Sequence, residues 1–338
     1  MHGAYGMSML ARVLLVLIAL AIGAGAVAWI VRYQPFGPAG PVGSPLPSTH
    51  PAAAGWVEGS EAPFARLEMA TATLDGRIWL AGGLEPGGGV TDALSIFDPA
   101  TGEWTDGPPL PAAVHHAALA SDGDRLFLIG GYLATTNGPT DEVHLFDPAT
   151  GTWEAGPSLP EPRAAGAATH DGTRIVYGGG VGPGGVRDDL FALAEGAWSR
   201  IGTLTRAREH LAAATDGDGR AWFMGGRQGA LDRNVGDVDL VDATSVRRLP
   251  AVSSRGGVAA FFAPGIGACL TGGEAPSFAL TTVECVDADG RITALPEMGQ
   301  RRHGHGAAVI DGIAYAVLGG EVPGLSSSST VELLLLEN

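Results

Sequence analysis

Polar and apolar positions alternate in a repeat that runs from residue 55 to the end of the chain. Short apolar runs, such as residues 78–81 and 126–129, end at a Gly-Gly pair. Six such pairs follow one another at a nearly constant interval, at 82–83, 130–131, 178–179, 225–226, 272–273 and 319–320. Short apolar runs bounded by turn residues predict β-strands. A fixed period of about 40–50 residues is typical of radial repeat proteins.

Each unit of the repeat contains four predicted strands, which we call a to d. Asp-Gly, a dipeptide typical of tight hairpins, precedes the apolar run at 75–76, 122–123, 171–172, 216–217 and 311–312. Strand b ends at the Gly-Gly pair, and strand c follows shortly after it. In units 1 to 3 an aromatic residue in strand c precedes a Trp at a constant spacing, as Phe97/Trp104, Phe146/Trp153 and Phe191/Trp198.

This pattern resembles the kelch repeat, whose marks are the Gly-Gly pair and the spaced aromatic–Trp pair. The resemblance covers about residues 55–338 and implies an all-β fold, a six-bladed kelch-type β-propeller. Units 5 and 6 depart from the pattern, because Val286 with Thr293, and Leu334 with no successor, replace the aromatic–Trp pair.

The ring is predicted to close through its N-terminal strand. The last unit stops after strand c, at residues 331–336, and so lacks strand d. Trp56 precedes Gly82 by the same spacing as Trp104 precedes Gly130, so Trp56 lies in the register of a strand d. We therefore predict that residues 55–58 supply the outer strand of blade 6, which removes an open sheet edge.

Residues 1–54 carry no part of the repeat. After a short tail, residues 1–12, the segment 13–31 has no charge and no proline. As a helix it would be about 28 Å long, close to the ~30 Å hydrocarbon core of a bilayer. We predict a single transmembrane signal anchor, with a cleaved signal peptide as the alternative. Residues 32–54 are Pro-rich and predict a semi-extended linker, so either reading carries the propeller, residues 55–338, across the membrane.

The composition argues against one class of function and indicates where the protein is located. All 20 basic residues are Arg, and against 36 acidic residues they leave a net charge of −16. This balance disfavours nucleic-acid binding, because phosphate contacts need positive charge. Exclusive use of Arg with abundant Ala, Gly and Pro suggests a GC-rich bacterial genome. We therefore expect a single-pass protein of a bacterial membrane, with its propeller on the extracytoplasmic side.

An Arg recurs where strand a begins in five units, and unit 2 has Val114 there. The five residues are Arg66, Arg163, Arg208, Arg255 and Arg302. Pseudo-symmetry predicts that they ring the channel mouth, and guanidinium is suited to carboxylate ligands. The alternative is that each Arg pairs with loop carbonyls and acids of the neighbouring blade. From the ring we expect a non-catalytic binding scaffold for an unknown protein, acidic peptide or glycan.

Histidines follow this position in units 2, 4 and 6, at His116, His210 and His305. Three His on alternate blades could hold Zn²⁺ or Cu²⁺, but no Glu motif or Cys ligand accompanies them. We therefore expect these side chains to contact a ligand, and we expect neither a metal nor a cofactor.

The two cysteines lie in unit 5. A hairpin centred on Ser277 places Cys269 opposite Cys285, since the two are equally far from its centre. An exported domain could oxidise such a pair, and a disulfide is our hypothesis. Two free thiols remain the alternative, because disulfide geometry is demanding.

Common enzyme motifs are absent from the sequence, which contains no G-x-S-x-G, P-loop, H-E-x-x-H or C-x-x-C pattern. Copper radical oxidases also use kelch propellers, but they need a Tyr–Cys crosslink, and the two Cys here share one unit. The chain resembles a periplasmic sialic-acid mutarotase in blade number, Arg content and export. Glu209, between Arg208 and His210, is a conceivable acid–base group for that chemistry. A mutarotase or epimerase is therefore the alternative function.

Overall fold

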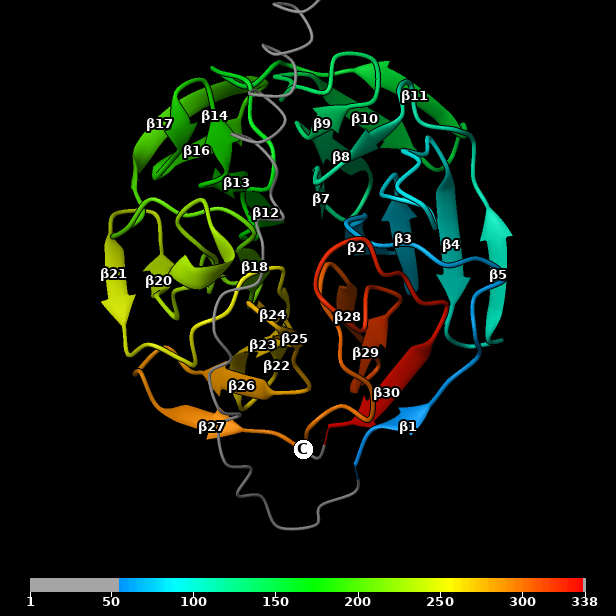
Figure 1. The fold of residues 1–338 in the computed structure, drawn as a ribbon. Helices are drawn as coiled ribbons and strands as arrows, with labels where there is room; N and C mark the ends of the chain where they lie inside the picture. The colour runs from blue at the N-terminus through cyan, green and yellow to red at the C-terminus, as the bar shows by residue number, and fades with distance from the viewer. Residues whose placement is uncertain (1–54, 337–338) are drawn as a thin grey trace, which may run out of the picture. The chain divides into compact units, whose positions relative to one another are not determined.

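The computed structural model describes residues 55–336, which form six four-stranded antiparallel sheets arranged in a ring (Figure 1). Blades 1 to 3 contain β2 (Ala70–Leu74), β3 (Arg77–Ala81), β4 (Leu94–Asp98) and β5 (Glu103–Asp106); β7 (Ala118–Ser121), β8 (Leu126–Ile129), β10 (Val143–Asp147) and β11 (Thr152–Ala155); and β12 (Ala167–His170), β13 (Ile175–Gly178), β16 (Asp189–Ala194) and β17 (Ala197–Thr203).

Blades 4 to 6 repeat this order. They contain β18 (Ala212–Thr215), β19 (Ala221–Met224), β20 (Val238–Val241) and β21 (Val246–Leu249); β22 (Ala259–Ala263), β23 (Gly267–Thr271), β26 (Val283–Val286) and β27 (Ile292–Ala294); and β28 (Gly306–Ile310), β29 (Ile313–Val317), β30 (Val331–Leu335) and β1 (Val57–Glu58). The first strand of each blade contacts its counterparts in the two neighbouring blades, and these six strands surround the axis. The predicted six-bladed all-β propeller is confirmed.

Strand β1 closes the ring as predicted. Val57 pairs with Leu333 of β30, and Glu58 pairs with Glu332. Trp56 donates its indole N–H to the carbonyl of Pro296 in blade 5, at 2.9 Å. The indole N–H groups of Trp153 and Trp198 bond in the same way to the carbonyls of Pro108 and Pro157 in the preceding blades. The shared contact shows that Trp56 occupies the strand-d position of blade 6.

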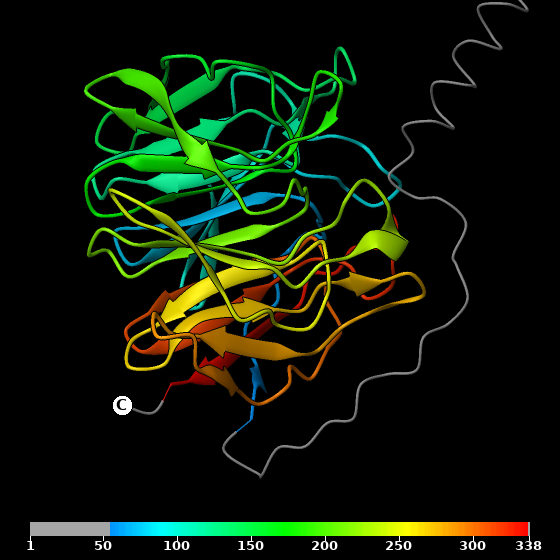
Figure 2. The same ribbon diagram turned by 90° about the vertical axis from the view of Figure 1, so that its left-hand side faces the viewer.

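The loops between strands b and c carry additional short elements at one end of the ring. They are β9 (Tyr132–Leu133), which pairs with β6 (Val114–His115); the β14 (Val181–Gly182) and β15 (Gly185–Val186) hairpin; the 3₁₀ turn η1 (Leu231–Arg233); and the β24 (Glu274–Ala275) and β25 (Phe278–Ala279) hairpin. Figure 2 shows these loops projecting together from one side of the stacked blades. We call this side the loop-bearing end.

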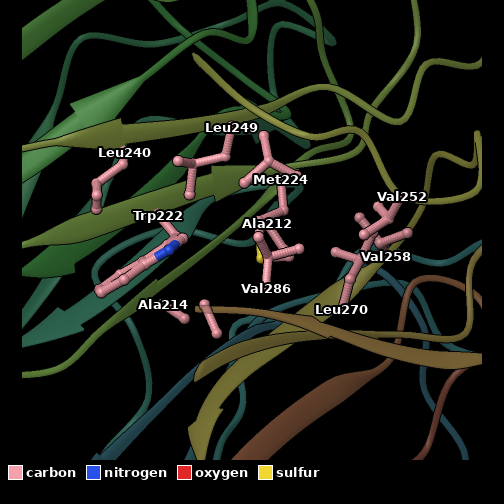
Figure 3. Packing of buried hydrophobic residues seen from close by; sticks show 12 residues of the cluster. Ala212, Ala214, Trp222, Met224, Leu240, Leu249, Val252, Val258, Leu270 and Val286 are labelled. Carbon is pink, nitrogen blue, oxygen red and sulfur yellow. The ribbon is translucent and has the colours of Figure 1, made fainter. Parts of the chain in front are cut away.

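The hydrophobic core is divided into six clusters between adjacent blades. The cluster between blades 4 and 5 contains Trp222 and Met224 of β19 together with Leu270 of β23 (Figure 3). The Gly-Gly pairs allow the blades to approach at the loop-bearing end. Gly82 has a φ of 62°, and a Cβ there would collide with the carbonyl oxygen of Val114 in the next blade.

In blade 3 the aromatic residue and the Trp do not lie opposite each other, although their spacing along the sequence is the same as in blades 1 and 2. Phe97 and Phe146 lie directly opposite Trp104 and Trp153, whereas Trp198 lies opposite Leu193. The turn between β16 and β17 is tighter, so the same spacing along the sequence produces another pairing in blade 3.

Cys269 of β23 lies directly opposite Cys285 of β26, and the two are joined by a disulfide. The predicted tail 1–12, membrane segment 13–31 and linker 32–54 lie outside the described residues. Between residues 55 and 336, no helix has the length and apolar character needed to cross a membrane.

Candidate functional site

A closed ring of backbone hydrogen bonds surrounds the axis near the loop-bearing end. One residue of each blade donates its N–H to the carbonyl of the equivalent residue in the preceding blade, at 2.7–3.0 Å. We call these six residues the axial ring: Glu68, His116, Ala165, His210, Gly257 and Gly304. Each lies two positions after the recurrent Arg, or after Val114 in blade 2, so the repeat itself places them.

All six axial-ring residues have a left-handed backbone. Their φ angles lie between 52° and 63°, a region that costs an L-residue with a side chain about 1–2 kcal/mol. Blades 5 and 6 have Gly at this position, but blades 1, 2 and 4 have Glu68, His116 and His210. Residues held in this region concentrate at functional sites.

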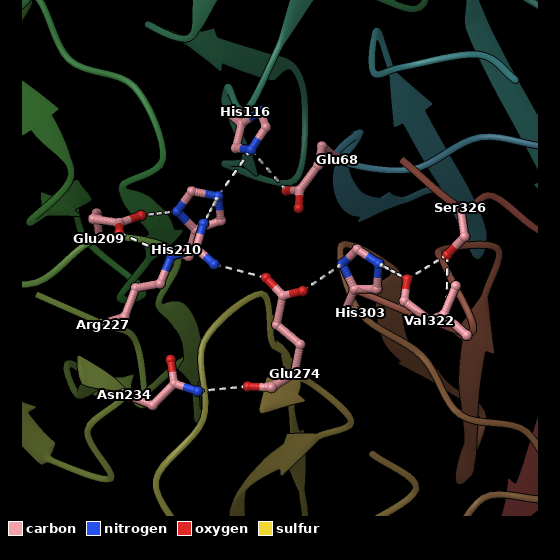
Figure 4. Close-up of polar contacts among 10 residues, drawn as sticks. All are labelled: Glu68, His116, Glu209, His210, Arg227, Asn234, Glu274, His303, Val322 and Ser326. Atoms are coloured by element: carbon pink, nitrogen blue, oxygen red, sulfur yellow. Dashed lines mark hydrogen bonds and ion pairs between the residues drawn. The ribbon is translucent and has the colours of Figure 1, made fainter. Parts of the chain in front are cut away.

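The three large side chains of the axial ring converge. Nε2 of His116 lies 2.9 Å from Nε2 of His210 and 3.4 Å from Oε2 of Glu68 (Figure 4). They line a cavity of about 130 Å³, to which each blade contributes its axial-ring residue and the three residues that follow it. The fold therefore brings a carboxylate and two imidazoles together at one cavity.

Four further side chains surround these three groups. Glu209 and His303 come one position before an axial-ring residue, and Arg227 and Glu274 lie in the b–c loops. Arg227 is 1% exposed and donates hydrogen bonds to two carboxylates and one imidazole. Its Nε donates to Oε1 of Glu209 at 2.9 Å, its NH1 to Oε1 of Glu274 at 2.7 Å, and its NH2 to Nε2 of His210 at 2.8 Å. His303 lies 3.6 Å from the other oxygen of Glu274 and bonds to the carbonyl of Val322.

We call the seven interacting side chains the axial cluster: Glu68, His116, Glu209, His210, Arg227, Glu274 and His303. Because the guanidinium of Arg227 can only donate, its contact with Nε2 of His210 assigns the ring proton to Nδ1, which faces Oε2 of Glu209. Nε2 of His210 is then an acceptor that points toward His116 and Arg227.

Burial determines the protonation of the cluster. Desolvation, with Arg227 and His303 adding to it, lowers the pKa of His116 to about 3, and the same causes lower the pKa of His210 well below its usual value. Desolvation raises the pKa of Glu68 to about 7, with nearby His303 acting against it. Both imidazoles are therefore neutral at pH 7, and Glu68 exchanges its proton near that pH.

The recurrent Arg residues lie inside the blades and do not form the exposed rim that we expected. Arg66 is 4% exposed, and Arg163, Arg208, Arg255 and Arg302 are at most 1% exposed. Four of them pair with a carboxylate of strand c in their own blade: Arg163 with Asp189, Arg208 with Asp239, Arg255 with Glu284 and Arg302 with Glu332. Arg66 bonds instead to Ser95. A desolvated guanidinium needs such a partner, so this position serves the interior of each blade.

The third histidine of the predicted triad lies elsewhere. His305 is one position beyond the axial ring, and its Nε2 bonds to the hydroxyl of Thr271 at 2.7 Å. The place beside His116 and His210 that we expected His305 to occupy is taken by Glu68. The constant offset from the Arg position would have identified Glu68 from the sequence. Arg227 and Glu274 each directly follow a Gly-Gly pair, so their register was visible too, but nothing in the sequence marked that position as facing the axis.

Comparison with known proteins agrees with this architecture. Residues 68–247 match the family model described as the KLHDC2/KLHL20/DRC7 Kelch-repeats domain. A solved structure titled "Structure of YjhT" is similar over 83% of this chain and 97% of that chain, with a TM-score of 0.71 and 16% identity. At this identity the likeness concerns the fold. No curated protein matches the chain.

Proposed function

Because the chain belongs to the kelch-repeat domain family, we propose that it is a ligand-binding propeller whose binding site is the axial cluster. The observation that carries this proposal is the placement of Glu68, His116 and His210. All three have a left-handed backbone and all three line the same cavity. Polar groups that converge on a cavity are the usual basis of small-ligand specificity.

Among the partners expected from the sequence, we favour a neutral glycan. The recurrent Arg side chains are already paired inside the blades, and a net charge of −16 repels polyanions. Carboxylates and imidazoles hydrogen-bond to sugar hydroxyls. The rings of His115 and Tyr132, 5.3 Å apart, pack beside His116 behind the lining of the cavity.

Binding to an array of neutral glycans, acidic glycans and acidic peptides tests this choice. We expect the protein to bind neutral oligosaccharides with an affinity that is the same at low and high NaCl, because no net charge is neutralised. Selective binding of acidic peptides that disappears at high salt would overturn the preference for a neutral ligand.

We also propose that the propeller lies on the extracytoplasmic side of a bacterial membrane, held there by residues 13–31. The Cys269–Cys285 disulfide supports this location, since such bonds persist in oxidising compartments. Protease added to intact spheroplasts should digest or release the propeller, and denatured protein from the same cells should contain no free thiol. A protected propeller with two free thiols would contradict the proposal.

Carbohydrate mutarotation or epimerisation is the second candidate, and the protonation of the cluster favours it. Opening a sugar ring requires a proton donor and an acceptor, and a group that titrates near pH 7 is suited to both roles. Glu68, with a pKa of about 7, lies next to neutral His116. Anomer exchange of sialic acid and of glucose, measured by NMR, should exceed the spontaneous rate and fall to it in Glu68→Gln. Exchange at the spontaneous rate with the wild-type protein would eliminate this candidate.

A further inference from the structure

The axial cluster has the composition of a metal site as well as that of a ligand site. We propose that Glu68, His116 and His210 bind a divalent transition-metal ion of the Zn²⁺ class, through one carboxylate oxygen and two Nε2 atoms. This proposal goes beyond glycan binding and does not depend on it.

The donor atoms are already close to coordination distances. Zn–N and Zn–O bonds of about 2.0–2.2 Å in a tetrahedral site separate neighbouring donors by about 3.3 Å. The two Nε2 atoms are 2.9 Å apart, and Oε2 of Glu68 is 3.4 Å from that of His116. All three donors lie within 4.8 Å of one another. The two separations that involve Nε2 of His116 thus differ from this spacing by about 0.4 Å or less.

Both histidines are held with Nε2 directed inward. Nδ1 of His210 contacts Glu209, and a carboxylate on the outer nitrogen is the usual support of a metal-binding His. In the metal-free protein, Nε2 of His116 donates to Nε2 of His210. Metal binding requires this proton to move to Nδ1 of His116, where it can bond to Nδ1 of His115. Metal binding requires Arg227 to release His210, while its bonds to Glu209 and Glu274 remain.

The charges around the donors also favour a cation. Glu68, Glu209 and Glu274 supply three carboxylates. Arg227, which bonds to Glu209 and Glu274, is the one guanidinium bonded to any of them among the described residues. Buried carboxylates need compensating charge, which a divalent ion would provide. Three protein ligands leave a fourth coordination position, as in open zinc sites, and the 130 Å³ cavity provides room for a water or a ligand oxygen there.

Glycine variants test the proposal without disturbing the fold. Gly257 and Gly304 occupy the axial-ring positions of blades 5 and 6 with the same backbone, so His116→Gly and His210→Gly should fold normally. The full chain, purified in detergent with any tag removed and treated with EDTA, is titrated with ZnCl₂ by calorimetry. We expect one ion per chain, with an affinity that falls at least about 100-fold in either Gly variant. His144→Ala, in β10 outside the cluster, should bind like the wild type.

A second measurement separates ligands from supporting residues. Co²⁺ bound to the wild type should show the intense visible bands of a four-coordinate site, and Glu68→Gln should lose them. Glu209→Gln should keep a weakened site, with affinity reduced about 10–100-fold. Wild-type protein that binds no Zn²⁺ or Co²⁺, or Gly variants that bind as well as the wild type, would overturn the proposal. Because the titration contains no glycan, a failure to find a glycan ligand leaves its result unaffected.

Discussion

Arg208 and Asp239 are both fully buried and lie 2.8 Å apart inside blade 4. Arg208 also donates to the carbonyl of Phe223, at 2.9 Å. The recurrent Arg is therefore a packing element of the kelch blade that ties the start of strand a to strands b and c. Its regular spacing is visible in the sequence. In four of the five blades that carry it, the buried Arg is paired with a carboxylate of strand c, and only the folded blade establishes that pairing.

Removing this buried Arg should destabilise the protein strongly. Arg208→Met leaves the Asp239 carboxylate without its partner, and we expect the free energy of unfolding to fall by about 3–5 kcal/mol. The double variant Arg208→Met/Asp239→Leu should recover most of the loss, because it removes the unpaired charge. Urea denaturation of both variants measures the difference. A single variant as stable as the wild type would show that the ion pair contributes little.

Protonation of the buried histidines should make the propeller acid-labile. Burial lowers the pKa of four of them, His115, His116, His210 and His305. Their unfolded values lie near 6.5, so the unfolded chain binds more protons below that pH, and stability falls as the pH decreases from 6.5 toward 3. Glu68 acts in the opposite direction, because its raised pKa makes the folded state bind the extra proton between about 4.5 and 7.

The melting temperature in EDTA should therefore fall steeply between pH 6.5 and 4, because four histidines outweigh one glutamate. His305→Asn, which removes one of the four, should show a shallower decrease. A melting temperature that is constant or rises toward pH 4 would mean that these imidazoles are not held neutral in the folded state.

At the scale of elements, the period of the Gly-Gly pairs and the register of Trp56 were sufficient to predict the ring and its closing strand. Both signals are repeated, so each blade supports the assignment of the others. The axial site was harder to predict. Glu68 lies in the repeated frame but differs in residue type from its counterparts. Arg227 and Glu274 directly follow Gly-Gly pairs, where blades 1 and 2 have Leu84 and Tyr132, so residue type again gave no repeated signal.

The closing strand offers a direct test at this scale. Trp56→Ala removes the indole bond to Pro296 and a partly buried aromatic surface. We expect the free energy of unfolding to fall by about 2 kcal/mol, since replacing a fully buried Trp by Ala costs about 3–5 kcal/mol. Glu58→Ala, an exposed change in β1 two residues later, should stay within about 0.5 kcal/mol of the wild type. If Trp56→Ala is as stable as Glu58→Ala and the wild type, the closing segment contributes little to the stability of the ring.

At the scale of the whole molecule, the six blades make nearly equivalent contributions to the axis, and the site arises where three of them differ. Ala165, Gly257 and Gly304 complete the hydrogen-bonded ring but bring no donor. The other three positions bring the carboxylate and the two imidazoles. The scaffold is thus symmetric in its backbone and asymmetric in its chemistry, which is the arrangement expected of a binding site built on a repeat.

Calorimetry with the neutral oligosaccharide that binds best on the array tests the central claim, that the axial cluster is the binding site. Glu68→Gln changes the cluster with little change in shape, and His144→Ala is the matched control outside it. We predict that Glu68→Gln weakens binding at least about tenfold and that His144→Ala leaves it unchanged. Equal affinities of Glu68→Gln and the wild type would place the binding site elsewhere on the propeller.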